Sequence, residues 1–300
     1  MTLSRPVAVA RGTRRTLWPV HMLAVTVPHA EVELASGLCW GAGIAGLEER
    51  GGVAGNATLV VGTDDPDALV AALGSRWPIE PVVEDQDLWV DSWKPWARAI
   101  RIGRAMSIRP PWIGPADLDS DASIDLVIDP GRAWGHGAHP TTAMVLELLV
   151  QDDPWGSEVL DVGCGSGVLS VAAARLGASR VVGVDIDRDA PPVTRRNAVA
   201  NGVGDIVVAS NDDVRAIDDR FDLVLANIGA ATLAELAAAL ADRVGADGSL
   251  ILSGLLDEQT VSVLDAYADW EVVERLERDG WVAFTLVRTV QSSRSSSSGS

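Results

Sequence analysis

Residues 158–185 read EVLDVGCGSGVLSVAAARLGASRVVGVD, and this stretch decides the fold. The pattern predicts a strand over Glu158–Asp161, a helix over Ser170–Leu176 and a second strand over Arg180–Val184, which ends at Asp185. A strand, a glycine-rich turn, a helix and a strand ending in an acid form the opening unit of a doubly wound parallel sheet that binds a nucleotide-like ligand. We therefore expect an α/β domain with its ligand at the carboxyl ends of the strands.

The spacing of the glycines separates two classes of ligand. Gly163, Gly165 and Gly167 follow the pattern G-x-G-x-G, and Val168 stands where a dinucleotide site places its third glycine. The glycines let the backbone approach a ligand closely, and the helix that follows adds free N–H groups. The carboxylate of Asp185 can accept hydrogen bonds from both hydroxyls of a ribose. This spacing favours S-adenosylmethionine over a dinucleotide, so an oxidoreductase is a remote alternative.

The remaining elements complete a seven-stranded sheet of the class I methyltransferase type, because a closing hairpin places an antiparallel strand inside the sheet edge. The expected strands and helices are Asp205–Ser210, Phe221–Ala226, Ala230–Val244 (helix), Ser249–Ser253, Asp257–Tyr267 (helix), Glu271–Arg278 and Trp281–Arg288, with a turn at Asp279–Gly280. Gly245–Gly248 is expected to end the first of these helices. An acid or amide among 211–213 could meet an adenine amino group, or it could serve as a helix cap or turn.

The sequence pattern of the N-terminal region predicts a smaller α+β domain. Its elements are expected at His21–Val27 (strand), Ala30–Gly41 (helix), Ile44–Glu49 and Ala57–Gly62 (strands), Asp65–Arg76 (helix) and Ile79–Glu84 (strand). This β-α-β-β-α-β order is that of the ferredoxin-like fold. The unit carries no cluster of His, Cys or carboxylate side chains with chemistry of its own. It is either a packing domain or a docking surface for a substrate.

The segment between the two units is rich in Trp, Pro and Arg. It holds Trp89, Trp93, Trp96 and Trp112 together with Lys94, Arg98, Arg101, Arg104 and Arg109. A basic and aromatic stretch can bind nucleic acid. In an acidic chain, packing across a domain seam with the cations paired to carboxylates is the favoured interpretation. We accordingly divide the chain into a leader (1–17), a recognition domain (18–84), a connector (85–120), a methyltransferase domain (121–290) and a disordered Ser-rich tail (291–300).

Composition restricts the partners and the compartment. The 300 residues include 24 Lys and Arg against 42 Asp and Glu, so the net charge is −18, which repels nucleic acid and attracts a basic partner. Two cysteines cannot form a disulfide framework, and this fits the cytoplasm. Arg14–Arg15 precede an apolar stretch as in a twin-arginine signal, but Pro19 and Pro28 interrupt that stretch, so neither a signal peptide nor a membrane helix is expected. We expect a monomer without a metal site.

Residues 129–142, DPGRAWGHGAHPTT, resemble the characteristic segment of the PrmA-type ribosomal-protein methyltransferases, which is close to DPGxAFGTGTHPTT. The resemblance continues through VLDVGCGSGVLSVAAARLGA, VGVDID, NAVANGV, LVLANI and LSGLLDEQ to the strand that contains Trp281. It is strong from Asp85 to Arg288 and weak in sequence before that. The family uses S-adenosylmethionine to methylate lysine side chains and the N-terminal amine of the eleventh protein of the large ribosomal subunit. The resemblance implies the same activity here.

The resemblance also implies the site residues. Thr142, Gly163, Asp185 and Asn227 correspond to the cofactor-binding positions, and Asn227 would present its amide to both the cofactor and the incoming amine. Asn227-Ile228 stands where enzymes that methylate planar exocyclic amines carry Asn-Pro-Pro-aromatic, and this argues against a nucleobase as target.

The chain departs from the family at the expected mouth of the site. Trp134, His136 and Ala138 replace the family's Phe and two Thr, whereas His139 is family-like and is expected to orient the loop. His136 is either a local base or a bulky filler. These departures concern the target, so two alternatives stay open: a methyltransferase of the same fold that acts on a small molecule or another protein, and a binding protein without activity.

Overall fold

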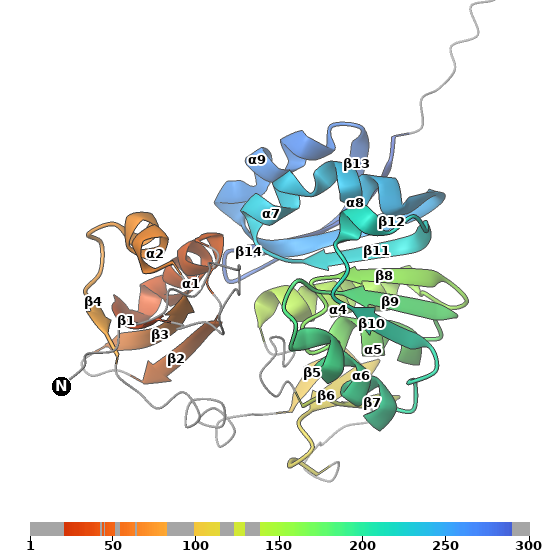
Figure 1. Ribbon diagram of the computed structural model, residues 1–300, viewed down its shortest axis with the longest axis horizontal. Helices are drawn as coiled ribbons and strands as arrows, with labels where there is room; N and C mark the ends of the chain where they lie inside the picture. Colours follow the sequence, from red (N-terminus) through yellow and green to blue (C-terminus); the bar gives the residue numbers. More distant parts are fainter. Residues whose placement is uncertain are drawn as a thin grey trace, which may run out of the picture.

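The structure is a computed structural model in two lobes (Figure 1), and it describes residues 21–42, 44, 46–51, 55–63, 65–82, 99–114, 123–129 and 139–289. The expected leader, the expected tail and the side chains of Trp134, His136 and Ala138 lie outside these ranges. Within them, no helix has both the length and the apolar character that crossing a bilayer requires.

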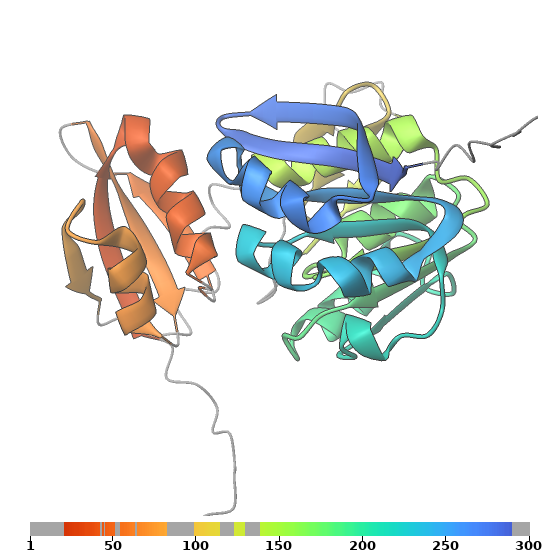
Figure 2. The same cartoon turned by 90° about the horizontal axis from the view of Figure 1, so that it is seen from above.

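The smaller lobe is a four-stranded antiparallel sheet with two helices on one face. Its elements are β1 (His21–Pro28), η1 (His29–Glu31), α1 (Val32–Gly41), β2 (Gly46–Gly51), β3 (Asn56–Thr63), α2 (Pro66–Leu73) and β4 (Ile79–Pro81), in the sheet order β2-β3-β1-β4. Asp65 caps α2 by accepting a hydrogen bond from the Ala68 amide, and Pro66 occupies the first turn. Figure 2 shows α1 on the side of this lobe that faces the larger one.

The larger lobe contains the expected seven-stranded sheet, in the order β10-β9-β8-β11-β12-β14-β13. Its strands are β8 (Glu158–Val162), β9 (Arg180–Val184), β10 (Val207–Ser210), β11 (Phe221–Asn227), β12 (Val244–Leu256), β13 (Trp270–Arg278) and β14 (Trp281–Arg288). The first five strands of the order are parallel, and β14 runs antiparallel between β12 and β13. The hairpin turns at Asp279 and Gly280, which both have positive φ, as an Asp-Gly turn requires.

Helices cover both faces of this sheet and divide its core in two. They are α4 (Pro140–Asp152), α5 (Val168–Arg175), α6 (Ala190–Ala200), η4 (Val214–Ala216), α7 (Ala230–Glu235), α8 (Ala237–Arg243), η5 (Asp257–Gln259), α9 (Thr260–Leu264) and η6 (Asp265–Tyr267). Met144, Leu148 and Val171 belong to one core, whereas Leu233, Leu240 and Val263 belong to the other. The two-sided burial explains the continuous apolar runs of the central strands.

Three strands that precede α4 in the sequence pack against the core that contains Met144. They are β5 (Ile100–Ile102), β6 (Met106–Arg109) and β7 (Ile124–Val127), in the order β5-β6-β7. Ile102, Met106 and Ile108 are buried in the same cluster as Met144. Part of the segment expected to connect the two domains therefore contributes to the core of the larger one. Arg109, one of the cations of that segment, pairs with Asp125 at 2.8 Å.

The structure corrects two sequence predictions. The helix expected over Ala230–Val244 is two short helices that meet at Leu236, and Gly245–Gly248 lies inside β12 instead of ending a helix. An added Cβ at Gly248 would lie 2.7 Å from the Asp222 carbonyl oxygen, so this glycine permits a close approach of neighbouring strands.

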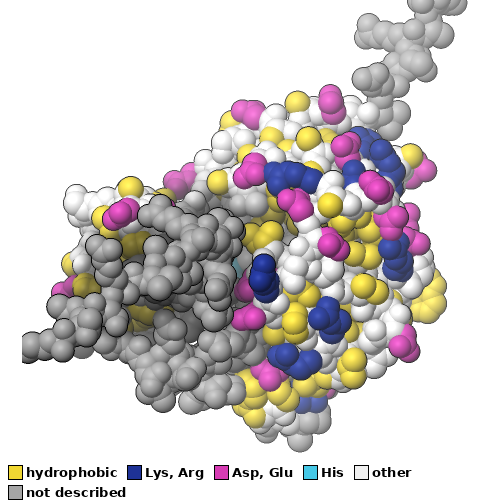
Figure 3. All heavy atoms as spheres, in the orientation of Figure 1, with side chains coloured by type: hydrophobic (Ala, Val, Ile, Leu, Met, Phe, Trp, Pro, Cys, Tyr) yellow, Lys and Arg dark blue, Asp and Glu magenta, His cyan; other side chains and the backbone are white. Residues whose placement is uncertain are grey.

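Charged side chains of both signs are interspersed over the visible face of the larger lobe (Figure 3). Arg180 pairs with Glu158 and Asp219, and Arg275 pairs with Asp257 and Glu277. These cations therefore face carboxylates of the chain itself. Each such exposed pair contributes little to stability, on the order of 0–1 kcal/mol.

We predict that Gly254→Ala destabilises the chain far more than Gly280→Ala. Both glycines have positive φ, but an added Cβ at Gly254 would lie 2.3 Å from the Ile228 carbonyl oxygen, whereas at Gly280 it would meet no atom within 4 Å. Backbone strain alone costs about 1 kcal/mol, and the clash raises the loss at Gly254 to about 3 kcal/mol. Urea denaturation measures both losses, and equal values would contradict the packing.

Candidate active site at the carboxyl ends of β8, β9 and β11

The residues expected to form the site gather where three parallel strands end. The glycine turn follows β8, Asp185 follows β9, and Asn227 is the last residue of β11. Since β9, β8 and β11 are neighbours in the sheet, the three segments lie side by side at one edge (Figure 1). This edge is where open α/β sheets bind their ligands.

The turn after β8 needs its glycines for two reasons. Gly163, Gly165 and Gly167 have φ values of 77°, 53° and 79°, which side chains other than glycine rarely adopt. An added Cβ would also lie 2.4 Å from Ile228 Cγ2 at Gly163, and 2.9 Å from Thr194 Cα at Gly167. The turn thus packs closely against both α6 and the residue that follows β11. It leads directly into α5, whose first residue is Val168.

Asp185 faces the glycine turn. Its Oδ2 accepts a hydrogen bond of 2.9 Å from the Gly165 amide, and its Oδ1 accepts one of 2.9 Å from the Asp187 amide. The side chain is half-buried, and burial raises the pKa of its carboxyl above the usual value. Each carboxylate oxygen can accept a second hydrogen bond, so the group keeps acceptor capacity for a ligand.

At Asn211 and Asp213, the structure supports the structural alternative of the two that the sequence left open for residues 211–213. The Asn211 amide donates to the carbonyl oxygens of Asp185 and Asp187, at 2.9 and 2.8 Å. Asp213 caps η4 by accepting a hydrogen bond of 2.8 Å from the Arg215 amide. Both side chains therefore shape the rim of the site.

Thr142 and Asn227 are 85 residues apart in sequence, and the fold joins them. Asn227 Nδ2 donates to Thr142 Oγ1 at 3.2 Å. Thr142 is buried in the first turn of α4, which begins at Pro140. Ile228, the next residue after Asn227, contacts Gly163. All four predicted site residues thus belong to one connected set, with Asp185 linked to it through Gly165.

His139 is the N-cap of α4, and it links this helix to the smaller lobe. Its Nδ1 lies 2.8 Å from Thr141 Oγ1, and its ring packs edge-on against Trp281 with 4.9 Å between the ring centres. Trp281 Nε1 in turn donates to a carboxylate oxygen of Glu33 on α1. The expectation that His139 orients the segment before it stays untested, because residues 130–138 lie outside the described ranges.

Sequence reasoning missed Asp161, a fully buried carboxylate at the base of the glycine turn. Its Oδ2 accepts hydrogen bonds from the Ser170 amide and hydroxyl, at 3.0 and 2.6 Å. Its Oδ1 is buried and has no hydrogen-bond partner within the described part of the chain. Burial, the main cause, raises the pKa of this carboxyl to about 6. The signal was available, because Asp161 stands two residues before Gly163, so it ends up beside the turn wherever the turn lies.

The hydrogen-bond acceptors beside the glycine turn fit S-adenosylmethionine. Among the described residues, Asp161 carries an acceptor oxygen without a partner and Asp185 offers further acceptor capacity, while the contacts with Ile228 and Thr194 hold the glycine turn beside them. Two carboxylates near one turn suit a ligand with positive charge and hydroxyl groups. A phosphate would be repelled by them.

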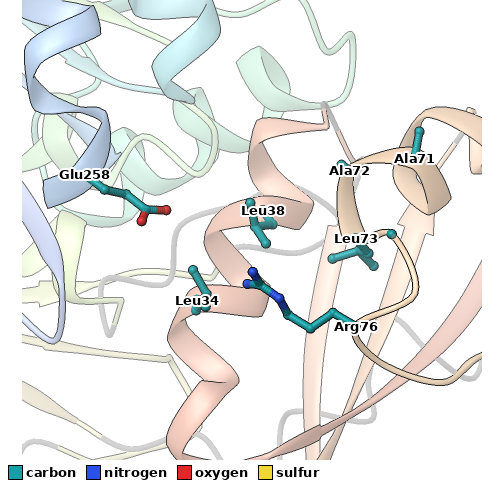
Figure 4. A pocket seen from close by; sticks show the side chains of 8 residues that line it. Leu34, Leu38, Ala71, Ala72, Leu73, Arg76 and Glu258 are labelled. Carbon is teal, nitrogen blue, oxygen red and sulfur yellow. The ribbon is translucent and has the colours of Figure 1, made fainter.

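A groove of about 310 Å³ lies elsewhere, between the two lobes (Figure 4). It is lined by Leu34, Leu38, Ala71, Ala72, Leu73, Gly74, Arg76 and Glu258. None of the four predicted site residues lines it. The groove belongs to the seam between α1, α2 and η5, away from the glycine turn.

We predict that Asp161 makes stability depend on pH. A raised pKa means that the folded chain holds this proton more tightly than the unfolded chain, so the contribution of Asp161 to stability grows as the pH falls from 7 to 4. For a shift from 3.8 to about 6, the change amounts to roughly 2–3 kcal/mol. Urea denaturation of the parent chain and of Asp161→Asn, each at pH 7 and pH 4.5, measures the part of the free energy of unfolding that depends on pH through Asp161. A difference between the two chains that does not change with pH would contradict the assignment.

The comparisons with known proteins agree with this geometry. The family model for ribosomal protein L11 methyltransferase (PrmA) matches residues 75–289. A ribosomal protein L11 methyltransferase of Citrifermentans bemidjiense is 44% identical over 210 residues, and one of Shewanella sp. (strain W3-18-1) is 40% identical over 204 residues; each match covers 68% of both chains.

One solved structure resembles the larger lobe closely enough to test the fold. The crystal structure of ribosomal protein L11 methylase from Lactobacillus delbrueckii subsp. bulgaricus is 29% identical and superposes with a TM-score of 0.59, covering 64% of this chain and 98% of that chain. The seven-stranded methyltransferase sheet is thereby confirmed. The chain belongs to the ribosomal protein L11 methyltransferase (PrmA) family, and it is a protein methyltransferase that uses S-adenosylmethionine.

Proposed function

We propose that the chain transfers methyl groups from S-adenosylmethionine to amines of ribosomal protein L11, on lysine side chains, on the N-terminal amine or on both. The observation that carries the proposal is the hydrogen bond from Asn227 to Thr142 beside the glycine turn, which holds an amide at the end of β11 next to the expected cofactor site. The relatives at 40–44% identity bear the name of this activity.

Thr142, Gly163, Asp185 and Asn227 hold the cofactor in this proposal. The Asp185 carboxylate accepts hydrogen bonds from the ribose hydroxyls with the acceptor capacity that Gly165 and Asp187 leave. Ile186 supports the assignment, because it is 91% exposed directly beside Asp185 and offers apolar surface to a flat base. Asp161 adds negative charge close to the turn, which favours a cation.

The cofactor supplies a methyl group already activated by its sulfonium, so the chain needs little acid–base chemistry. What the residues must do is hold a neutral amine in line with that methyl group. A lysine amine in water has a pKa near 10.4 and is charged, but transfer into a desolvated site lowers that pKa. Asn227 Nδ2 donates to Thr142, so the amide oxygen of Asn227 is free to accept a hydrogen bond from the incoming amine. This hydrogen bond would orient the lone pair of the amine nitrogen toward the methyl group.

The smaller lobe serves as the substrate-recognition domain in this proposal, with bounds 18–84, followed by the connector 85–120 and the methyltransferase domain 121–290. Its β-α-β-β-α-β element order and the sheet order β2-β3-β1-β4 support a ferredoxin-like fold. Its α1 contacts the larger lobe through Glu33 and Trp281, so a protein bound to it stays near the site.

We propose further that the enzyme acts as a monomer in the cytoplasm and contacts the basic ribosomal protein, not RNA. The net charge of −18 supports a Lys-rich partner through electrostatic complementarity. Cys39 and Cys164 are both buried free thiols, which supports a reducing compartment.

The decisive experiment is incubation of the chain with radiolabelled S-adenosylmethionine and large-subunit proteins from cells that lack this gene. We expect the label in L11, and peptide mass spectrometry should place it on amines. Asn227→Ala is the matched control, since it removes the amide but leaves the glycine turn intact. Label in another protein or in the small-molecule fraction would contradict the proposed target.

We also predict that Asp185→Ala weakens cofactor binding by about 1–3 kcal/mol, the scale of a buried hydrogen-bonding group left unpaired. Asp187→Ala is the control, because Asp187 lies in the same loop, is exposed, and its side chain accepts a hydrogen bond from the Asp189 amide, away from the glycine turn. Isothermal titration with S-adenosylhomocysteine gives both dissociation constants. Equal constants for the two variants would count against the role of Asp185.

A further inference from the structure

Two asparagines, Asn197 in α6 and Asn201 at its C-cap, hold the end of β7 and the residues just after it by their side chains. Asn201 Oδ1 accepts from the Val127 amide at 2.9 Å, and Asn201 Nδ2 donates to the Val127 carbonyl oxygen at 2.7 Å. Asn197 repeats the pattern with Asp129, accepting from its amide at 3.0 Å and donating to its carbonyl oxygen at 2.9 Å. Each carboxamide thus pairs with one residue of the chain as a neighbouring strand would.

The spacing of the two elements explains the pairing. Four residues along a helix rise about 6.0 Å, and two residues along a strand rise about 6.6 Å, so side chains at i and i+4 of α6 meet alternate residues of β7. β6 occupies the other edge of β7. The two asparagines therefore cover the remaining edge, which would otherwise bury unpaired backbone groups.

Asn197 differs from Asn201 in its second donor. Asn197 Nδ2 also donates to the carbonyl oxygen of Ser166 at 2.8 Å, and Ser166 lies within the glycine turn. The second donor of Asn201 stays within α6, on the Asn197 carbonyl oxygen at 2.7 Å. Asn197 is only 3% exposed, and its amide oxygen and both amide hydrogens are used. Asn197 alone of the pair therefore ties the glycine turn to β7.

The turn needs such a support. Its three glycines impose no conformation of their own, because glycine tolerates many backbone angles. Thr194 Oγ1 holds the Gly165 carbonyl oxygen at 3.0 Å, and Asn197 holds that of Ser166. Without the carboxamide, a buried carbonyl oxygen of the turn loses its donor, and the turn can settle in another position.

We propose that Asn197 is a positioning residue for the methyl transfer: its carboxamide joins Asp129, the first residue of the DPGRAWGHGAHPTT segment, to Ser166 in the glycine turn, and so fixes the turn in the form that binds the cofactor. The proposal rests on the assignment of the cofactor to this turn under the proposed function. Asn197 itself touches neither the cofactor nor the reacting atoms.

Isothermal titration of the full chain with S-adenosylhomocysteine tests this inference. Asn197→Ala is expected to raise the dissociation constant at least tenfold, which corresponds to about 1.4 kcal/mol. Asn201→Ala is the matched control: it removes the same kind of paired contact to β7 but leaves the turn, so its constant should change less than twofold. Both variants should lower the melting temperature by similar amounts. Equal constants for the two variants would overturn the proposal.

A measurement on the parent chain keeps the proposal testable if Asn197→Ala does not fold. Amide hydrogen exchange is followed by NMR with and without S-adenosylhomocysteine. We expect cofactor binding to slow exchange of the Asp129 amide at least tenfold and to leave the Val127 amide unchanged. Equal changes at both amides would overturn the role of Asn197, whereas absence of any binding by the parent chain would overturn the proposed function itself.

Discussion

The site depends on how closely Ile228 is enclosed by two glycines. Ile228 follows β11, Gly163 follows β8 on one side, and Gly254 lies at a bulge in β12 on the other. A Cβ at either glycine would lie within 2.4 Å of an Ile228 atom. This contact fixes the backbone beyond Asn227, and the hydrogen bond to Thr142 then fixes the Asn227 amide. The glycine turn, the end of β11 and the first turn of α4 are therefore positioned together.

The two carboxylates at the site lower the stability of the folded chain when they are charged. Asp161 and Asp185 both have raised pKa values, chiefly because burial disfavours their charged forms. Asp161 also leaves one buried oxygen without a partner within the described ranges. A ligand with positive charge beside these carboxylates would favour their charged forms, and the same attraction would add to its affinity under the proposed function.

The sequence predicted most of this architecture because its signals are local. The β8 strand, the turn and β9 follow from glycine spacing and apolar runs, and Pro140 marks the start of α4. Signals that depend on distant contacts were missed. No Gly or Pro marks the break at Leu236, and Gly248 suggested a helix end because its crowding against Asp222 comes from a neighbouring strand. The joining of Thr142 to Asn227 came from the family resemblance, since nothing in the spacing of two residues 85 apart requires it.

Two sets of side-chain contacts are among those that connect this site to parts of the chain outside its own sheet. Asn197 joins β7 to the glycine turn, and the Glu33–Trp281–His139 contacts join α1 to the start of α4. The ladders of the seven-stranded sheet do not reach these elements, because β7 belongs to another sheet than β8 and α1 is a helix. Asp129 and His139 flank residues 130–138, which include the departures from the PrmA pattern at Trp134, His136 and Ala138, and each is held by one of these sets. Variation between two such anchors can change what the site accepts while the cofactor turn stays in place.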